Sequence, residues 1–126
     1  MTFVFVQDVM EDSDAVVLIY FDRHDGTAAK QADISTITYK VIDTSTGTAV
    51  PGHDGASLTV SAVIFDTLQT HPRWTFSSGF NFKHTLLYTA FPTGDTIYNY
   101  EVTVTWGTGG QTKLLGKCRT QALLGS

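Results

Sequence analysis

Hydrophobic and polar residues alternate with a period of two along most of the chain, which is the pattern of half-buried β-strands. The clearest run covers residues 97–106, where every second side chain is apolar. The apolar positions are Tyr98, Tyr100, Val102, Val104 and Trp106. One face of this strand is therefore expected to be buried while the other faces water. We expect Tyr98, Tyr100 and Trp106 to determine the fold.

Further strands are predicted from the same alternation and from the turn residues between the runs. They cover residues 14–21, 34–43, 57–64, 80–87 and 111–121, preceded by a short apolar segment at residues 2–6. Residues 50–55 are interpreted as a turn-rich connection, and residues 65–74 as the place for a short helical turn that Pro72 ends. About seven strands with turns at intervals of roughly ten residues predict an all-β protein, specifically a single immunoglobulin-like antiparallel β-sandwich.

The chain of 126 residues fits one domain. Residues 1–7 are either an arm that pairs with the sheet edge of a neighbouring molecule or the first edge strand of their own domain, and residues 8–126 form the sandwich. Gly94–Tyr98 resembles a tyrosine corner, in which a tyrosine hydroxyl bonds back to the chain just before it. Tyr98 or Tyr100 fills that role, unless both are plain core aromatics.

Charge and composition exclude several classes of partner. The formal net charge is −4, and the eight lysines and arginines are scattered, so no nucleic-acid surface is expected. The longest apolar run has seven residues, 15–21, against about 20 for a membrane-spanning helix. No Lys or Arg precedes Arg23, so no signal peptide is expected. These features predict no membrane partner and synthesis as a soluble protein in a cytoplasm.

No set of residues predicts catalysis, a metal or a cofactor. Asp8, Glu11, Asp12 and Asp14 form an acidic cluster, but their spacing fits no EF-hand loop, so we expect a solvated loop. His24, His53, His71 and His84 stand far apart; His24 and His53 fall in expected turns, and His84 is expected to be half-buried. Cys118 lies in the middle of a strand and is expected to be a buried side chain and not a reactive thiol. The G-x-S-x-G nucleophile motif is absent from the sequence, so an enzyme is not expected.

Two segments suggest binding to another protein. Phe3, Val4 and Phe5 lie in the short apolar segment, which is able to add to a sheet edge through main-chain hydrogen bonds. Arg73 and Trp74 place two residue types that are enriched in binding hot spots in an irregular loop. The plainer interpretations are a first strand of the domain itself and a tryptophan that closes one end of the core.

The order of several short segments resembles a group of small structural proteins of tailed bacteriophages. The segments are Val-Met-Glu-Asp-Ser-Asp at 9–14, Ala-Asp-Ile-Ser-Thr-Ile-Thr-Tyr-Lys-Val at 32–41, Val-Ile-Phe-Asp-Thr-Leu-Gln-Thr at 63–70, Gly-Phe-Asn-Phe at 79–82 and Phe-Pro-Thr-Gly at 91–94. The resemblance implies a virion protein that decorates or cements a capsid, or belongs to the head, neck or tail. Its expected partners are phage virion proteins or further copies of itself. An alternative function is a carbohydrate- or cell-surface-binding module, which exposed rings at Trp74, Phe76 and Tyr88 would favour.

Overall fold

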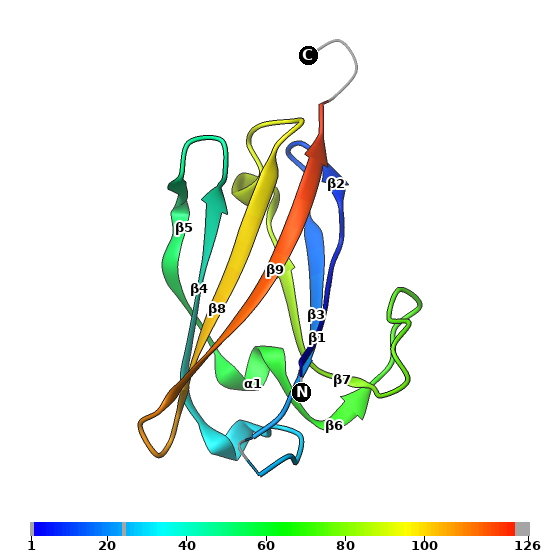
Figure 1. Cartoon of the computed structure of the whole chain (residues 1–126), viewed down its shortest axis with the longest axis vertical. Helices are drawn as coiled ribbons and strands as arrows, with labels where there is room; N and C mark the ends of the chain where they lie inside the picture. Colours follow the sequence, from blue (N-terminus) through cyan, green and yellow to red (C-terminus); the bar gives the residue numbers. More distant parts are fainter. Residues whose placement is uncertain (1, 24, 123–126) are drawn as a thin grey trace.

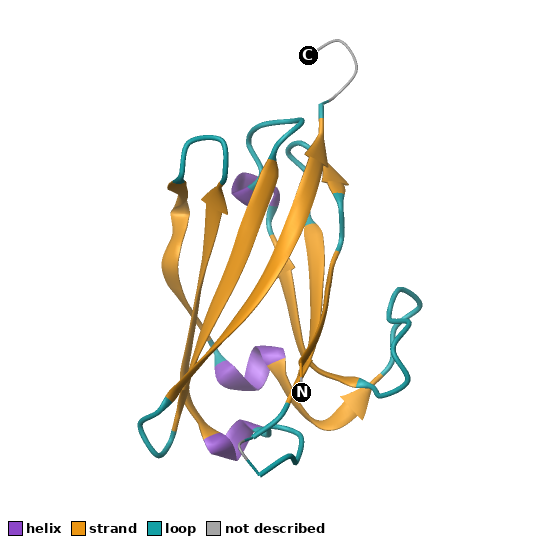
Figure 2. Ribbon diagram, in the orientation of Figure 1, coloured by secondary structure: helices purple, strands orange, loops and turns teal. Residues whose placement is uncertain are grey.

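The computed structural model describes residues 2–23 and 25–122, which form two layers of β-strands with short helical turns at the ends (Figure 1, Figure 2). The elements in chain order are β1 (Thr2–Val6), β2 (Val9–Met10), β3 (Ala15–Phe21), η1 (Gln31–Asp33), β4 (Ile34–Asp43), β5 (Thr48–Leu58), α1 (Val60–Val63), β6 (Ile64–Gln69), β7 (Phe80–Leu86), η2 (Tyr88–Ala90), β8 (Ile97–Trp106) and β9 (Gln111–Gln121).

The order of the strands confirms an immunoglobulin-like sandwich. One sheet has the order β1-β3-β7-β6 and the other β2-β9-β8-β4-β5. When β1 and β2 are taken as two halves of a first strand A, the sheets become A-B-E-D and A-G-F-C with one added strand, which is the immunoglobulin arrangement. The pairs between described strands are antiparallel except for the short pairing of β2 with β9, which is parallel.

The chain passes from the first sheet to the second between β1 and β2. All five residues of β1 pair with β3, and the Gln7 N–H continues that ladder by donating to the Val16 carbonyl. One residue later, the Asp8 carboxylate accepts a hydrogen bond of 3.0 Å from the Arg119 N–H on β9. Residues 2–6 are therefore the first strand of their own domain and not an arm outside it.

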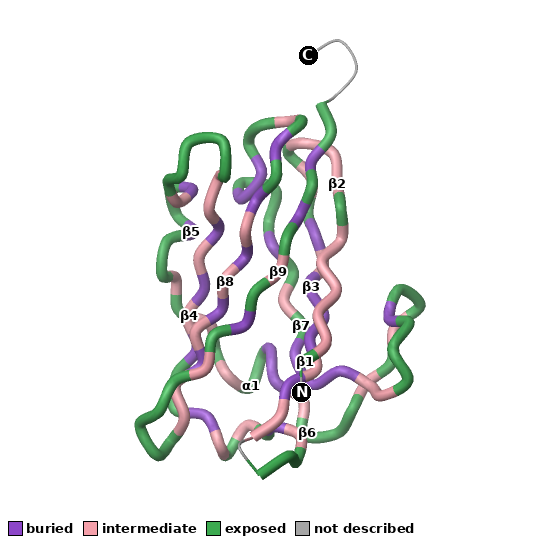
Figure 3. The backbone as a smooth tube through the Cα atoms, in the orientation of Figure 1, coloured by how far each residue is buried: buried purple, intermediate pink, exposed green. Residues whose placement is uncertain are grey.

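The main core lies between the sheets and is lined by the alternating positions that the sequence predicts (Figure 3). In β8 the side chains of Tyr98, Tyr100, Val102 and Val104 are buried, and the two tyrosines are the largest fully buried residues of the described chain. Trp106 is only partly buried; its ring packs 5.9 Å from that of Phe21 and its indole N–H donates to the Thr112 hydroxyl. The predicted strands at 34–43, 97–106 and 111–121 are confirmed within their stated bounds.

The tyrosine corner is formed by Tyr98. Its hydroxyl accepts a hydrogen bond of 3.0 Å from the Thr93 N–H and lies 3.4 Å from the Thr93 carbonyl, to which it donates. Tyr100 points into the same core two residues later but bonds to His84 instead. The corner therefore holds the turn before β8 against the end of the sandwich.

The predictions for residues 50–74 are wrong. Residues 50–55 are part of β5, and the strand expected at 57–64 is interrupted by the single turn of helix α1 at residues 60–63, so that only residues 57–58 and 64 are strand. The expected helical turn at 65–74 is instead strand β6 followed by a loop. Gly52 and Gly55 look like turn residues, but in β5 they take φ angles of 83° and 74° and accompany shifts in the register of an edge strand, where such irregularities are tolerated.

Candidate functional site

The outer face of the sheet β1-β3-β7-β6 carries a cluster of apolar side chains, here called the aromatic face. The register pairs Phe3 with Tyr20 and Phe5 with Leu18, so these four side chains lie on one side, opposite Val4 and Val6, which pack on the main core. β6, β7 and the loop between them add further rings. The aromatic face consists of Phe3, Phe5, Val16, Leu18, Tyr20, Phe65, Trp74, Phe76 and Phe80.

Trp74 is the centre of this face. Its ring lies 5.7 Å from that of Phe80 in an edge-on arrangement and 4.8 Å from that of Phe76. Phe76 in turn stacks on Phe3, with 4.7 Å between ring centroids. These arrangements are the ones that aromatic pairs prefer. The two segments that the sequence suggested for binding, residues 3–5 and 73–74, thus meet through Phe76.

The loop at residues 70–79 holds Trp74 in place through its own backbone. The Trp74 N–H donates to the His71 carbonyl at 2.9 Å, the Arg73 N–H donates to the His71 ring, and the indole N–H donates to the Ser78 carbonyl. Because the indole N–H is satisfied inside the loop, Trp74 serves as an internal anchor. In Figure 1 the loop extends to the side of the sandwich between β6 and β7.

The aromatic face remains partly open to solvent. Trp74 is 9% exposed but Phe76 is 38% exposed, and Phe3, Phe5 and Tyr20 are half-buried. The exposed Lys83 pairs with Leu18 across β3 and β7 and so lies on the same side of the sheet. Partly exposed rings thus surround a buried tryptophan, and aromatic residues are among the types enriched at protein interfaces.

The five residues predicted for protein interaction have different positions. Phe3, Phe5 and Trp74 come together in the aromatic face. The Val4 side chain points to the main core, and Arg73 is exposed in the loop. Trp74 is buried on the outside of one sheet and does not close an end of the main core.

Sequence reasoning missed the side chains of Val16, Leu18 and Tyr20 as part of the face. A signal was available, because residues 15–21 are all apolar and such a run is typical of a strand that is covered on both sides. The long loop that covers the second side gave no such signal, since its four aromatic or basic residues, His71, Arg73, Trp74 and Phe76, follow no period.

Two sets of hydrogen bonds lie in the interior between the two sheets, and ring packing of Tyr39 on His84 brings them together. The Tyr39 hydroxyl meets His53 Nδ1 at 2.7 Å, and His53 Nε2 meets the Thr89 hydroxyl at 2.9 Å. From the other sheet, His84 Nδ1 meets the Tyr100 hydroxyl at 2.7 Å, and the His84 ring packs edge-on against Tyr39 at 4.7 Å. The half-buried position expected for His84 is confirmed, whereas the turn position expected for His53 is wrong, because His53 is buried in β5.

Burial disfavours the charged form of each of these groups. It lowers the pKa of His84 to about 4, with a further contribution from the nearby His53, and it also lowers the pKa of His53. Burial raises the pKa of Tyr39 and of Tyr100. All four side chains are therefore neutral hydrogen-bonding groups near neutral pH, which suits a structural role in the core.

The acidic cluster is dispersed over several structural contacts. Asp8 accepts from the Arg119 N–H and Asp14 from the Tyr88 N–H, while Asp12 has a φ of 56° in the turn before β3. Among the described residues, no group of three or more His, Cys, Asp or Glu side chains could hold a metal ion. His24 lies outside the residues that the structure describes.

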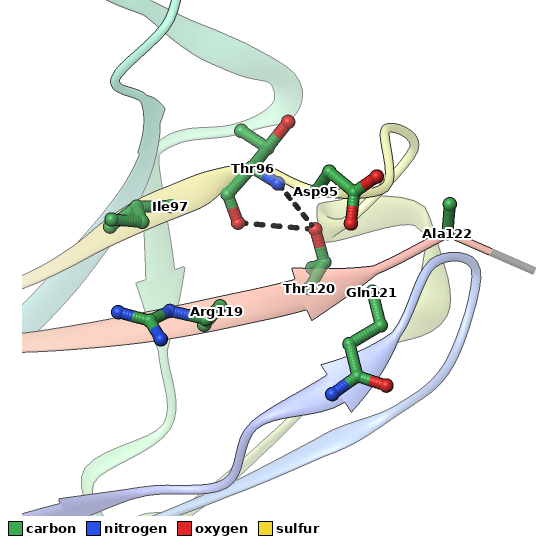
Figure 4. Close-up of a pocket in the computed structure, with 7 residues that line it drawn as sticks. All are labelled: Asp95, Thr96, Ile97, Arg119, Thr120, Gln121 and Ala122. Carbon is green, nitrogen blue, oxygen red and sulfur yellow. Dashed lines mark hydrogen bonds between the residues drawn. The ribbon is translucent and has the colours of Figure 1, made fainter.

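An open hollow near the described end of the chain is lined by polar groups of β9 and of the start of β8 (Figure 4). The Thr120 hydroxyl at its base lies 3.2 Å from the Thr96 N–H and 3.1 Å from the Thr96 carbonyl, so it ties β9 to the start of β8. Nearby in β9, Cys118 is buried and its thiol donates to the Gln7 carbonyl. Burial raises the pKa of this thiol to about 11, which makes it a poor nucleophile.

Comparison with known proteins yields no relative: no family model, no curated protein and no solved structure matches the chain. Among the described residues, no helix is long and apolar enough to cross a membrane.

Proposed function

We propose that the protein is a non-enzymatic structural component of a phage virion, a capsid decoration or cement protein or a head-tail component. In this role it binds a symmetric protein lattice through its aromatic face. The phage context of the proposal comes from the resemblance of the five short sequence segments. The single observation that carries the binding role is the stack of Phe3, Phe76 and Trp74 on the outside of the sheet.

The partly exposed rings of the aromatic face are a reason to expect a partner. Contiguous apolar patches on a protein surface mark sites of interaction, and interface energy concentrates in a few aromatic anchors surrounded by near-neutral contacts. Phe76 is the anchor that we expect a partner to cover. Its ring is 38% exposed, while contacts with Phe3 and Trp74 hold it in a fixed position.

The experiment that tests this role is quantitative mass spectrometry of purified particles from the source phage, with wild-type protein and with Phe76→Ser. We expect the wild-type chain to be present at a fixed ratio to the major capsid or tail protein. The substitution should lower its occupancy at least ~10-fold, since truncating a hot-spot ring costs about 2 kcal/mol of binding.

Tyr88→Ser is the matched control, because Tyr88 is even more exposed, at 55%, but lies outside the aromatic face. Its occupancy should equal that of the wild type. Particles that contain no copy of the chain would refute the virion role, and equal occupancy of Phe76→Ser and wild type would refute the role of the aromatic face.

A carbohydrate-binding module is the second candidate, and the exposure of Phe76 and Tyr88 is the observation that favours it. The two rings do not share a platform, however. The Tyr88 N–H donates to Asp14 just before β3, whereas Phe76 stacks on Phe3, which pairs with Tyr20 near the far end of β3, about 20 Å away along the strand. Binding on a glycan array that Tyr88→Ser or Phe76→Ser abolishes would support this candidate over the first.

A further inference from the structure

The edges of the two sheets differ in how well they are protected against pairing with another strand. β5 carries Pro51 and two glycines with positive φ, and its register is interrupted. β2 has two residues, and β6 pairs with β7 at only two positions. Proline, irregular register and short length are the usual protections of an edge. β1 has none of them: its five residues are in unbroken register, and none is charged or proline.

The backbone groups of β1 that face away from the sheet are identified by its ladder. In an antiparallel pair, the residues that bond to the partner strand alternate with residues whose N–H and C=O point outward. The Gln7 N–H bonds to the Val16 carbonyl, so Phe5 and Phe3 also bond inward to β3. The N–H and C=O groups of Thr2, Val4 and Val6 therefore point out of the edge, and β1 pairs with β3 alone among the described strands.

We infer that β1 pairs with β1 of a second copy of this chain to form a two-fold symmetric dimer with one continuous sheet. Antiparallel pairing centred on Val4 uses the outward groups of all three residues and forms about six main-chain hydrogen bonds. It also places Phe3 opposite Phe5 of the second copy, on the side of the aromatic face. Such aromatic pairs across strands stabilise an antiparallel sheet.

A second copy fits this edge better than an unrelated strand because the segment is complementary to itself. The sequence Thr-Phe-Val-Phe-Val places its two phenylalanines symmetrically about Val4. Because β1 carries no charge, two copies meet without repulsion between like charges. The edge is only about 17 Å long, so the interface is at the small end of specific interfaces and the dimer is expected to be weak.

This inference goes beyond the proposed function and does not depend on it, because it uses the backbone edge of β1 and not the exposed ring of Phe76. It is tested on the purified full-length protein alone. Failure to dimerise would leave the particle experiment unaffected, and absence from particles would leave the dimer unaffected.

The test is sedimentation velocity over a concentration series for the wild type, Val4→Pro and Val4→Ala. Proline at position 4 removes an outward N–H and leaves the β1–β3 ladder intact. Alanine removes the same side-chain packing but keeps that N–H. We expect the wild type and Val4→Ala to form a concentration-dependent dimer and Val4→Pro to dimerise at least ~10-fold more weakly. A wild type that stays monomeric up to about 1 mM, or a Val4→Pro variant that dimerises as Val4→Ala does, overturns the inference.

Hydrogen exchange of the wild type gives a second readout that needs no variant. The amides of Val4 and Val6 should exchange rapidly in dilute protein and become protected in concentrated protein. The amides of Phe3 and Phe5 should be protected at both concentrations, because they bond to β3. If a dimer forms while Val4 and Val6 exchange at a rate independent of concentration, the dimer uses another surface and the inference is wrong.

Discussion

His84 and Tyr100 approach each other from opposite sheets, and their hydrogen bond of 2.7 Å lies in the interior. The rings around His84 belong to Tyr39, Phe82 and Tyr100, and the titratable group that adds to its shift is His53. None of these neighbours is negatively charged near neutral pH, so none would stabilise a protonated His84. The folded protein therefore favours the neutral form of His84.

Stability should fall with acid for this reason. The pKa of His84 is lowered from 6.5 to about 4, so between these values the unfolded chain binds a proton that the folded protein does not. The stabilisation is complete above pH 6.5 and is lost as the pH falls from there towards about 4; by about pH 5 the loss is about 2 kcal/mol. His53, whose pKa is also lowered, acts in the same direction. Denaturant unfolding at pH 7 and at about pH 5 measures the difference.

The matched variant is His84→Gln, whose amide is able to bond to the Tyr100 hydroxyl but does not titrate. We expect its free energy of unfolding to depend less on pH over this window than that of the wild type. If both proteins lost the same stability between pH 7 and 5, the acid sensitivity would have a source other than His84.

At the scale of elements, the loop between β6 and β7 depends on a close approach of two backbones. A Cβ atom on Gly79 would lie 2.7 Å from the Gln69 carbonyl oxygen and 2.8 Å from Leu68 Cβ, and these are not flexible side-chain ends. The loop that carries Trp74 and Phe76 therefore closes only with glycine at this position.

Gly79→Ala should lower the free energy of unfolding by about 1–3 kcal/mol, as overpacking in a tight site does. It should also weaken any binding that the aromatic face provides, since the loop has to shift. Gly107→Ala is the control, because its Cβ would find only the Asp33 carbonyl at 3.7 Å, an ordinary contact. Thermal or denaturant unfolding of the two variants compares them directly; equal stabilities would mean that the loop adapts without cost.

The success of sequence reasoning differed between elements for physical reasons. β8 was predicted within its bounds because one of its faces is buried and the other faces water. Apolar and polar residues therefore alternate clearly along it. β5 was missed because an edge strand with positive-φ Gly52 and Gly55 has the residues of a turn. The helical turn α1 was missed because a segment of four residues is too short to show a helical period.

The candidate site was harder to predict than the fold. Phe3, Phe5 and Trp74 were chosen for residue type, and only tertiary structure brings them together through Phe76. Nothing local in the sequence indicates that residues 70–79 fold back onto a face formed by residues 3–20. Such a contact between distant segments has no periodic signature.

At the scale of the whole molecule, β1 contributes to both layers of apolar packing. Val4 and Val6 pack on the main core, while Phe3 and Phe5 belong to the aromatic face. Figure 3 shows β1 as a strand of intermediate burial along the border of the sandwich. The segment for which the sequence allowed either an arm or a first edge strand is thus part of the folded unit.

Removal of residues 2–6 should therefore destabilise the whole domain. It uncovers the edge of β3 and exposes apolar surface on both sides, so we expect the free energy of unfolding to fall by about 3 kcal/mol or more. Denaturant unfolding of the truncated and full-length proteins measures this. Replacing Phe3 and Phe5 with serine, with the strand kept, separates the loss of the aromatic face from the loss of β1. A truncated protein as stable as the full chain would show that β1 is dispensable for the fold.

The bond between Tyr100 and His84 has a wider consequence for the sandwich as a whole. In antibody domains, a cysteine stands two residues after the corner tyrosine and joins the two sheets covalently. Here Tyr100 occupies that place, two residues after Tyr98, and its link to the other sheet is a hydrogen bond to His84. Protonation of His84 weakens this link, whereas reducing agents do not affect it. The connection between the sheets is therefore independent of the redox conditions and is sensitive to acid.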